Sequence, residues 1–497
     1  TVLLVEAVDW GRRRRYHRQK LVVVYAAIRH FAAELAAAGF DVRARRVERF
    51  EDGIAAHLAE FPAATLVLMA PADHGVAQGI AAIVRQHGGA LTIVPNGLWL
   101  SDDATFDRWA AGRRRFLMED WYRAERRRTG WLMADPAGGP SRPGDPRAVP
   151  LGGAWNFDAE NRRVPAPGTR FPPVPRFPPD AITADVIRWV EATFADHPGR
   201  TDGFAWPVCR ADALVALADF VEERLPLFGP YEDAIVEGEP VLAHSLLSVP
   251  LNLGLITASE ACEAALRAAD DETRRGDPAR TVGLPSVEGF IRQLLGWREY
   301  LRHAYRTRMP ALRRAGFLGH AGDLPAFYWS GATRMRCVAT AVGQVLASGH
   351  AHHIQRLMVL GNWALLAGVD PVQVNDWFLE LFADAFDWVV TPNVMGMSQY
   401  ADPGFTTKPY VAGGAYIDRM SDHCRGCSYD PRRAMGPTAC PFTTLYWDFV
   451  DRHAPLLAGN PRTGTVVAAW RRRDPADRAS ILARAGEVRR LAVSGEL

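Results

Sequence analysis

A change of hydrophobic periodicity along the chain restricts its possible folds more than any other feature. Up to about residue 95, short apolar runs alternate with longer segments of helical period, whereas from residue 181 onward the helical period continues almost throughout. Alternation of strand and helix is typical of a parallel sheet covered by helices. The sequence therefore predicts an α/β part followed by an all-α part.

The predicted elements follow from this periodicity. Strands are expected at residues 2–6, 42–47, 65–70 and 91–94, separated by helices at 19–38, 52–60 and 77–87, with further helix over 101–133. In the all-α part the clearest helical patterns cover residues 186–194, 211–224, 287–305 and 338–366. No repeat of fixed period is present, which argues against a solenoid.

A segment rich in proline and glycine separates the two parts. Residues 135–180 include Pro136-Ala-Gly-Gly-Pro140 and Phe171-Pro-Pro-Val-Pro-Arg-Phe-Pro-Pro179, and proline interrupts both helices and sheets. We therefore expect an α/β domain at 1–134, a linker at 135–180 and an all-helical domain at 181–497.

Composition and apolar runs favour a protein of the cytoplasm. The longest uninterrupted apolar run, residues 21–28, is far shorter than the roughly 20 residues that span a bilayer. The start of the chain lacks the features of a secretory signal, and six cysteines in 497 residues are too few for a disulfide scaffold. Because Thr1 leads directly into a strand-like run, we expect the natural N-terminus to lie upstream.

Four of the six cysteines have the spacing of a metal centre. Cys424 and Cys427 form a CxxC pair, Cys440 follows shortly after, and Cys337 lies upstream on a predicted helix. Thiolates so arranged can bind either a 4Fe-4S cluster or zinc, although structural zinc sites usually combine two close pairs. Cys209 and Cys262 have no partner at ligand spacing and are predicted to be core residues.

Three histidines and an arginine fall within one short segment. In Gly349-His-Ala-His-His-Ile-Gln-Arg-Leu-Met358, helical spacing brings His352 and His353 near Arg356, while His350 is expected to be exposed. Asp384 and Asp387 lie in an apolar aromatic stretch, where a charge needs a partner, and Arg356 with Asp384 is the expected pair. The segment His244-Ser-Leu-Leu-Ser-Val-Pro-Leu-Asn252 could hold phosphates at a loop-to-helix junction.

With these segments the chain resembles the photolyase and cryptochrome family, within the bacterial branch that carries an iron-sulfur cluster and includes prokaryotic (6-4) photolyases. The resemblance extends from about Tyr16 to Trp470. Its most specific motifs are Met397-Ser-Gln-Tyr-Ala-Asp402, Thr407-Lys-Pro-Tyr410, Tyr416-Ile-Asp-Arg-Met-Ser-Asp-His-Cys424, Cys440-Pro-Phe442 and Tyr446-Trp-Asp448. Residues 351–358, 244–248 and 291–300 agree with it.

The resemblance implies a Rossmann-like antenna domain joined to an all-α FAD-binding domain. It implies a 4Fe-4S cluster on Cys337, Cys424, Cys427 and Cys440, and an antenna chromophore, 6,7-dimethyl-8-ribityllumazine. Relatives begin with an additional strand, so we expect the lumazine site to be incomplete here. The implied FAD-binding residues are Tyr231, Ser245, Leu246, Leu247, Ser248, Asn252, Gln293, Arg356, Asp384, Asp387 and Asn393.

The implied activity is light-driven repair of (6-4) pyrimidine-pyrimidone photoproducts. Excited, reduced FAD would pass an electron to a flipped-out lesion. His353 falls on the position of the proton donor, with His352 beside it. Trp377, Trp329 and Tyr416 match positions of an electron relay to oxidised flavin, although Phe378 replaces a tyrosine and is hard to oxidise.

The partner implied by the resemblance is UV-damaged DNA. A formal charge of +2 means that any DNA-binding face must be local, and the visible arginine runs are residues 12–15, 113–115, 123–128 and 432–433. We expect a cytoplasmic monomer that associates with the bacterial nucleoid during repair.

Two other functions fit the same residues. A cryptochrome-like blue-light receptor would keep the cofactors without repairing DNA, because a sensor could inherit both histidines. A cluster-containing nucleic-acid enzyme would lack flavin altogether. Flavin fluorescence after denaturation separates the last possibility from the other two.

Overall fold

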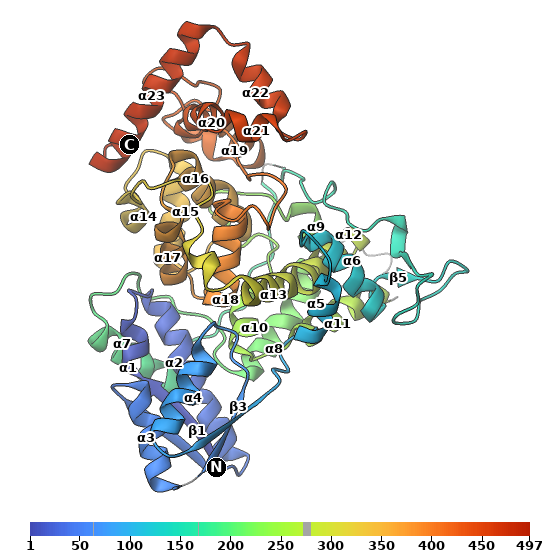
Figure 1. The fold of residues 1–497 in the computed structure, drawn as a ribbon, viewed down its shortest axis with the longest axis vertical. Helices are drawn as coiled ribbons and strands as arrows, with labels where there is room; N and C mark the ends of the chain where they lie inside the picture. The colour runs from blue at the N-terminus through green and yellow to red at the C-terminus, as the bar shows by residue number, and fades with distance from the viewer. Residues whose placement is uncertain (63, 167, 272–279) are drawn as a thin grey trace.

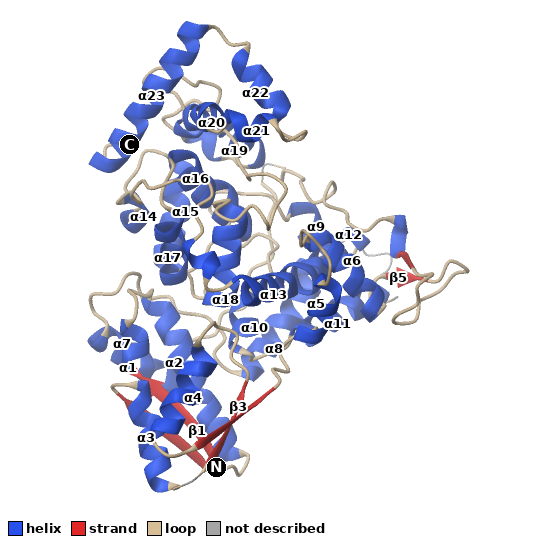
Figure 2. Ribbon diagram, viewed as in Figure 1, coloured by secondary structure: helices blue, strands red, loops and turns tan. Residues whose placement is uncertain are grey.

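The computed structural model describes residues 1–62, 64–166, 168–271 and 280–497. Figure 1 shows the N-terminal strands and the helices beside them at one end of the molecule and the C-terminal helices at the other. Among the described residues, strands are confined to the first 150, whereas helices make up most of the chain after residue 180 (Figure 2). The division into an α/β part and an all-α part agrees with the change of periodicity.

The α/β part alternates strands with helices close to the predicted positions. Its elements are β1 (Val2–Ala7), α1 (Val8–Arg12), α2 (Arg18–Ala37), β2 (Val42–Val47), α3 (Phe50–Glu60), β3 (Thr65–Met69), α4 (Val76–Gln86), β4 (Ala90–Val94), α5 (Asp103–Ala110) and α6 (Met118–Thr129). Residues 101–133 thus form two helices and the short β5 (Met133–Ala134) rather than one continuous helix.

The strands pair in parallel, but within the described residues they do not form one continuous sheet. β1 pairs with β2 and β3 pairs with β4, which gives two sheets of two strands each. Side chains of Val67, Met69 and Ile93 on the second pair are exposed. The second pair is therefore covered incompletely and depends on the neighbouring helices for burial.

The proline- and glycine-rich linker is mostly irregular, as its composition predicts. Apart from residue 167, which lies outside the described residues, it contains the short β6 (Val149–Pro150), antiparallel to β5, and one helical turn, η1 (Leu151–Gly153). In Figure 1 the loop between β5 and β6 projects from the side of the molecule.

The all-α part contains helices of very different length. In order they are α7 (Ala181–Thr193), α8 (Arg210–Asp219), η2 (Phe220–Arg224), α9 (Leu225–Tyr231), α10 (Ser248–Leu253), α11 (Ala258–Asp270), α12 (Leu284–Ile291), η4 (Arg292–Arg298), α13 (Glu299–Arg308), η5 (Ala311–Arg314), α14 (Phe327–Ser330), α15 (Arg336–Ser348), η6 (Gln355–Gly361), α16 (Asn362–Ala367), α17 (Pro371–Leu381), α18 (Asp387–Thr391), η7 (Pro392–Ser398), α19 (Gly414–Met420), η8 (His423–Gly426), α20 (Pro441–Arg452), α21 (Ala454–Ala458), α22 (Gly464–Arg471) and α23 (Pro475–Ser494).

The helix expected over 338–366 is interrupted. α15 ends at Ser348, and Gly349 adopts a left-handed conformation with φ of 65°. Its carbonyl accepts a hydrogen bond from the backbone N–H of Ala383, 2.9 Å away. Glycine tolerates this conformation at a helix C-terminus, which explains why the chain turns here before the segment that carries the three histidines.

One hydrophobic core spans the linker. Leu21, Val22 and Tyr25 of α2 pack with Val186 and Val190 of α7, which lies beyond the linker. Of two larger cores, one lies around α15 to α17, α20 and α23. In the other, Phe106 of α5 and Trp121 of α6 pack with residues of α8, α11 and α12, so residues 103–129 belong to a core shared with the helical part. Among the described residues, no helix is both long and apolar enough to cross a bilayer.

Candidate active site and cysteine cluster

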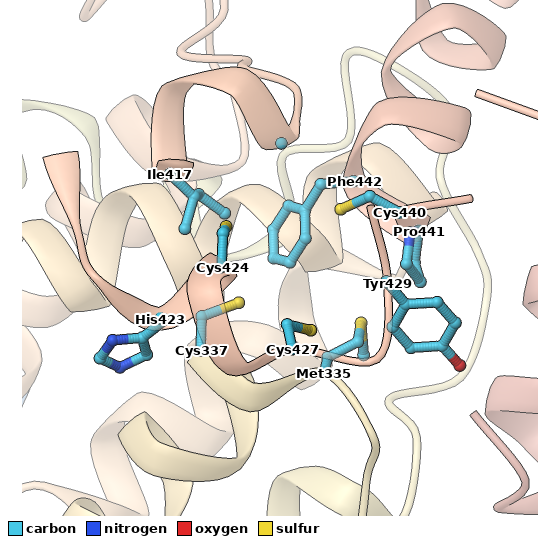
Figure 3. Close-up of a pocket in the computed structure, with 11 residues that line it drawn as sticks. Met335, Cys337, Ile417, His423, Cys424, Cys427, Tyr429, Cys440, Pro441 and Phe442 are labelled. Atoms are coloured by element: carbon cyan, nitrogen blue, oxygen red, sulfur yellow. The ribbon is translucent and has the colours of Figure 1, made fainter. Parts of the chain in front are cut away.

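The four cysteines of the predicted metal centre surround one small cavity. Cys337 lies in the first turn of α15, Cys424 in η8, Cys427 directly after η8, and Cys440 at the start of α20. All four line the cavity, together with apolar side chains that include Ile417, Tyr429 and Phe442 (Figure 3). The fold thus brings Cys337 to a trio that lies almost 90 residues further along the chain.

The four cysteines form one candidate thiolate site. All four line the same cavity, although they come from three separate segments of the chain. Four thiolates that surround one cavity can bind a single metal ion or a cluster at its corners.

Three of the four thiols have raised pKa values and are held in their neutral form. Burial, together with repulsion from the neighbouring thiolates, raises the pKa of Cys337 well above its ordinary value and that of Cys424 to about 12. Burial also raises the pKa of Cys440 to about 11. Four neighbouring thiolates therefore require a positively charged group between them, and its binding releases protons.

The expected pair of Arg356 and Asp384 forms in the structure. The guanidinium donates two parallel hydrogen bonds to the carboxylate, each 3.0 Å long. Asn252 donates from Nδ2 to the backbone carbonyl of Asp384 at 2.9 Å, which ties α10 to the same loop. Burial opposes ionisation of Asp384, but Arg356 and the Ser248 hydroxyl lower its pKa. This site therefore combines a fixed cation with a fixed anion.

The predicted phosphate loop leads into this pair. Leu246 has φ of 58°, a left-handed conformation that is strained for a residue with a side chain. The Leu247 backbone N–H is hydrogen-bonded to the Ser245 hydroxyl at 3.2 Å, and α10 begins at Ser248. After the strained turn at Leu246, the hydroxyl of Ser248 reaches the carboxylate of Asp384.

The other predicted flavin-binding residues each have partners within the protein. Gln293 donates to Glu232, while Tyr231 packs edge-on against Phe171. Asp387 accepts hydrogen bonds from Tyr305, Arg313 and Thr391, so its carboxylate is already satisfied. The Asn393 amide donates to a carbonyl of its own helical segment. Asp387 and Asn393 are thus bound to neighbouring elements.

The pKa values of the two predicted catalytic histidines shift in opposite directions. His352 is buried and stacks on His244 with ring centroids 4.8 Å apart. Burial and the neighbouring histidines lower the pKa of His352 far below its ordinary value. Within the described part of the chain, neither ring nitrogen of His352 has a hydrogen-bond partner, and Nε2 of His244 has none either. His352 is therefore a neutral imidazole with free nitrogens.

The pKa of His353, in contrast, is raised. Its side chain is 46% exposed, and Nε2 lies 3.5 Å from Oδ1 of Asp233. Desolvation opposes protonation of the ring, but hydrogen bonding to Asp233 and the charge of Glu232 raise the pKa of His353. Of the two histidines, His353 is the one suited to donate a proton.

His350 corrects one expectation. We expected an exposed side chain, whereas His350 is only 8% exposed and stacks edge-on against Trp206. Burial lowers its pKa to about 3, so the ring is neutral. The reason is the turn at Gly349, which directs the following residues into the molecule.

The predicted relay residues occupy contrasting positions. Trp377 is buried, donates from Nε1 to the backbone carbonyl of Tyr328 and contacts the rings of Tyr328 and Phe378. Trp329 is 40% exposed. Burial raises the pKa of Tyr416 to about 12, so its phenol is neutral. Trp377 is thus buried against Tyr328, whereas Trp329, the residue after Tyr328, is exposed.

The arginine runs are not uniformly solvated. Arg126 is fully buried and donates to backbone carbonyls of Leu132 and Trp155, so it serves the fold. Arg113 to Arg115 and Arg432 with Arg433 are exposed. The exposed residues remain available to phosphates.

Sequence patterns did not indicate the acids next to His353. Glu232 and Asp233 lie just after α9, more than 100 residues before the histidines. Neither belongs to a recognisable motif. A buried acid following a short helix gives no local signal, and only the tertiary fold brings these carboxylates to His353.

Comparison with known proteins identifies the family. Residues 1–206 match the family model described as deoxyribodipyrimidine photo-lyase-related protein. A (6-4) photolyase of Agrobacterium fabrum is 40% identical over 479 residues, covering 95% of this chain and 90% of that protein. An uncharacterised protein of Acanthamoeba polyphaga mimivirus, R855, is 39% identical over 23% of this chain and 85% of its own length.

The fold agrees with this relationship. A crystal structure of a bacterial class III photolyase from Agrobacterium tumefaciens covers 99% of this chain and 90% of its own, with a TM-score of 0.53 at 16% identity. At that identity the likeness concerns the fold alone. On the extended identity to the A. fabrum protein, the chain belongs to the photolyase family, in its deoxyribodipyrimidine photolyase-related branch.

Proposed function

We propose that this chain is a light-dependent DNA repair enzyme that reverses (6-4) photoproducts. The observation that carries the proposal is the 40% identity to a (6-4) photolyase over 95% of the chain. The opposite pKa shifts of His353 and His352 support it, because this repair needs a proton donor beside the lesion.

We propose that FAD binds beside the Arg356–Asp384 pair. The buried nitrogens of His244, His350 and His352 that lack partners lie near this pair and require a polar ligand. The segment from Ser245 to Ser248, with Asn252, would hold the diphosphate, and Gln293 and Tyr231 would lie along the cofactor. When reduced and excited by blue light, bound FAD supplies the electron for repair.

The chain's own residues then position the lesion and a proton. His353, held by Asp233, would donate from its protonated ring, while neutral His352 would accept or donate a hydrogen bond without adding charge. Trp377, Trp329 and Tyr416 are proposed to relay electrons to oxidised flavin. Exposed arginines would hold the DNA backbone of a monomeric enzyme.

We propose that the four cysteines bind a 4Fe-4S cluster. The gathering of all four cysteines around one cavity and the family resemblance support a cluster, and the raised thiol pKa values require a cationic group. A lumazine antenna in the α/β part is proposed on the family resemblance.

The test is repair of a defined lesion. The reduced protein is irradiated with an oligonucleotide that bears one (6-4) photoproduct, and restoration of the two bases is followed by chromatography. Wild type should restore them. His353→Ala should lose at least about 100-fold in rate, the usual contribution of a positioned proton donor, while still binding FAD.

Two outcomes would contradict the proposal. Intact flavin photoreduction without repair would make the protein a cryptochrome-like receptor. Full repair by His353→Ala would remove His353 from its role. Glu223→Gln, an exposed change on η2, is the matched control and should repair at the wild-type rate.

A further inference from the structure

Glu232 is a buried carboxyl group that the repair reaction proposed above leaves unexplained. It lies at the C-terminus of α9 and is 6% exposed. Its two oxygens have different partners, since Oε1 accepts from Nε2 of Gln293 and Oε2 from Nδ2 of Asn161, each at 2.8 Å. The carboxyl group thus joins α9, η4 and the linker.

The neighbouring helix approaches this carboxyl group closely. Gly289 of α12 has no side chain, and a Cβ atom there would lie 3.3 Å from Oε2 of Glu232 and 3.2 Å from Nδ2 of Asn161. Such contacts are tighter than ordinary van der Waals packing. The glycine gives α12 room to pack against the hydrogen-bonded pair.

Glu232 faces the two groups that the reaction is expected to use. Gln293 is a predicted cofactor contact, and the charge of His353 interacts with Glu232. Asp233, the next residue, lies 3.5 Å from the imidazole of His353. The charged or titratable groups around this pair are Asp158, Asp233, Arg356 and His244.

We propose that Glu232 is a positioning residue that fixes Gln293 and places a buried carboxyl group beside the Asp233–His353 pair while the lesion is bound. The proposal rests on the proposed function for its purpose. The effect of Glu232 on the pKa of His353, however, can be measured without light and without a lesion. Glu232 itself transfers no proton. Its negative charge stabilises the imidazolium of His353, and its hydrogen bonds hold the amide of Gln293 in one orientation.

The titration behaviour of the two groups agrees with this role. Burial raises the pKa of Glu232 to about 7, although the positive charge of His353 works in the opposite direction. The charge of each group therefore influences the ionisation of the other. His353 remains protonated to higher pH than an isolated histidine, and its proton is lost as the pH rises through the raised pKa.

The experiment compares wild type with Glu232→Gln in the FAD-loaded protein. The pKa of His353 is measured by NMR titration of ¹⁵N-labelled histidine, assigned with His353→Ala. Glu232→Gln should lower that pKa by about one unit, the usual effect of removing an adjacent opposite charge. The alkaline limb of the repair profile should move to lower pH by the same amount. Glu223→Gln, which removes an exposed acid nearby, should shift neither.

A second variant and the wild-type pKa of His353 test the proposal independently. Glu232→Asp, which retains the charge, should keep most of the raised pKa. A wild-type pKa for His353 at or below 6.5 would overturn the proposal without any variant, and so would an unchanged pKa in Glu232→Gln. If wild type repaired no lesion while the NMR shift appeared, the proposed function would fail and the link between Glu232 and His353 would stand.

Discussion

At the scale of single residues, buried charge carries most of the chemistry, and Lys20 shows how such a charge is tolerated. Lys20 is one of only two lysines in the chain, and its ammonium group donates to the backbone carbonyls of Leu379 and Ala385. It also lies 4.4 Å from the ring centroid of Tyr16. These contacts connect α2 with the loop that carries Asp384.

Lys20 should give the protein a distinct pH dependence. Burial lowers its pKa from 10.5 to about 7. Between these values the unfolded chain binds a proton at Lys20 that the folded protein does not, so this group makes the free energy of unfolding rise with pH. Lys20→Met should remove that rise. Thermal unfolding of both proteins at pH 7 and pH 9 measures the difference, and equal pH dependence in the two would contradict the assigned pKa.

The candidate site could be predicted from sequence only where its residues are close together or belong to a motif. The pairing of Arg356 with Asp384 followed from a charge in an apolar stretch that needs a partner. Glu232 could not be found in this way, because its partners Asn161 and Gln293 come from distant segments. The burial of His350 was missed because it depends on the turn at Gly349.

At the scale of elements, three π-helical segments coincide with predicted cofactor contacts. η4 contains Gln293, η6 contains Arg356 and η7 contains Asn393. Such wide turns are rare and frequent at functional sites, because they shift a side chain out of the regular helical register. Hydrophobic periodicity cannot predict them, since one additional residue in a turn barely changes the pattern.

The helix that borders the cysteine cavity leaves no room for a side chain at Gly414. A Cβ atom there would lie 2.9 Å from Sγ of Cys440 and 2.8 Å from Oγ1 of Thr443. Gly414→Ala should displace Cys440 and reduce both the iron bound per chain and the visible absorption of the proposed cluster. Gly343→Ala is the control. This glycine lies within α15, where a Cβ atom would meet nothing within 4 Å.

Alanine in the interior of a helix is favoured over glycine by about 0.5–1 kcal/mol, so the control should be slightly more stable than wild type with unchanged iron. Iron is measured colorimetrically against protein concentration. Full iron content in Gly414→Ala would show that Cys440 is not held at the cluster by this contact.

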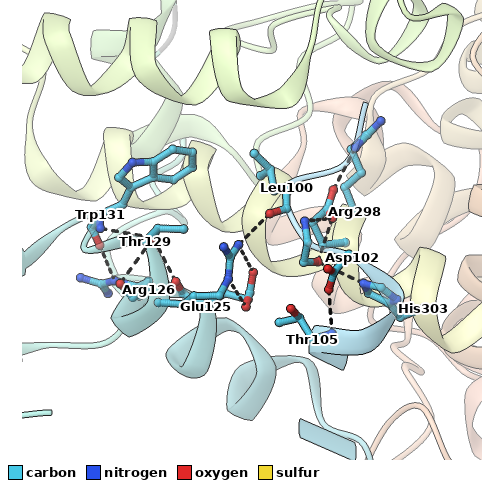
Figure 4. Close-up of polar contacts among 12 residues, drawn as sticks. Leu100, Asp102, Thr105, Glu125, Arg126, Thr129, Trp131, Arg298 and His303 are labelled. Carbon is cyan, nitrogen blue, oxygen red and sulfur yellow. Dashed lines mark hydrogen bonds and ion pairs between the residues drawn. The ribbon is translucent and has the colours of Figure 1, made fainter. Parts of the chain in front are cut away.

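At the scale of the whole molecule, a buried acid fastens the segment after β4 to the helical part. Glu299 of α13 accepts hydrogen bonds from the backbone and hydroxyl groups of Ser101, both at 3.1 Å, and from Arg298 at 3.0 Å. Figure 4 shows Leu100 and Asp102 lying against Arg298 and His303 in this region. The contact joins residues almost 200 positions apart.

Glu299→Ala should therefore destabilise the protein strongly. The change leaves Arg298 buried without its charged partner, which costs about 3–5 kcal/mol in the free energy of unfolding. Urea unfolding followed by circular dichroism measures the loss. Asp202→Ala, which removes an exposed ion pair with Arg200, should cost less than about 1 kcal/mol. Similar losses in the two variants would contradict the role of Glu299.

The core shared by α2 and α7 has a consequence for engineering. Residues 1–134 look like a module that could be excised or exchanged at the linker, yet their largest helix would then expose Leu21, Val22 and Tyr25, which α7 covers. A transplantable unit must include residues 181–193 and therefore the whole linker. The linker is then a loop within one cooperative unit, and domain exchange between relatives should succeed only with crossover points beyond α7.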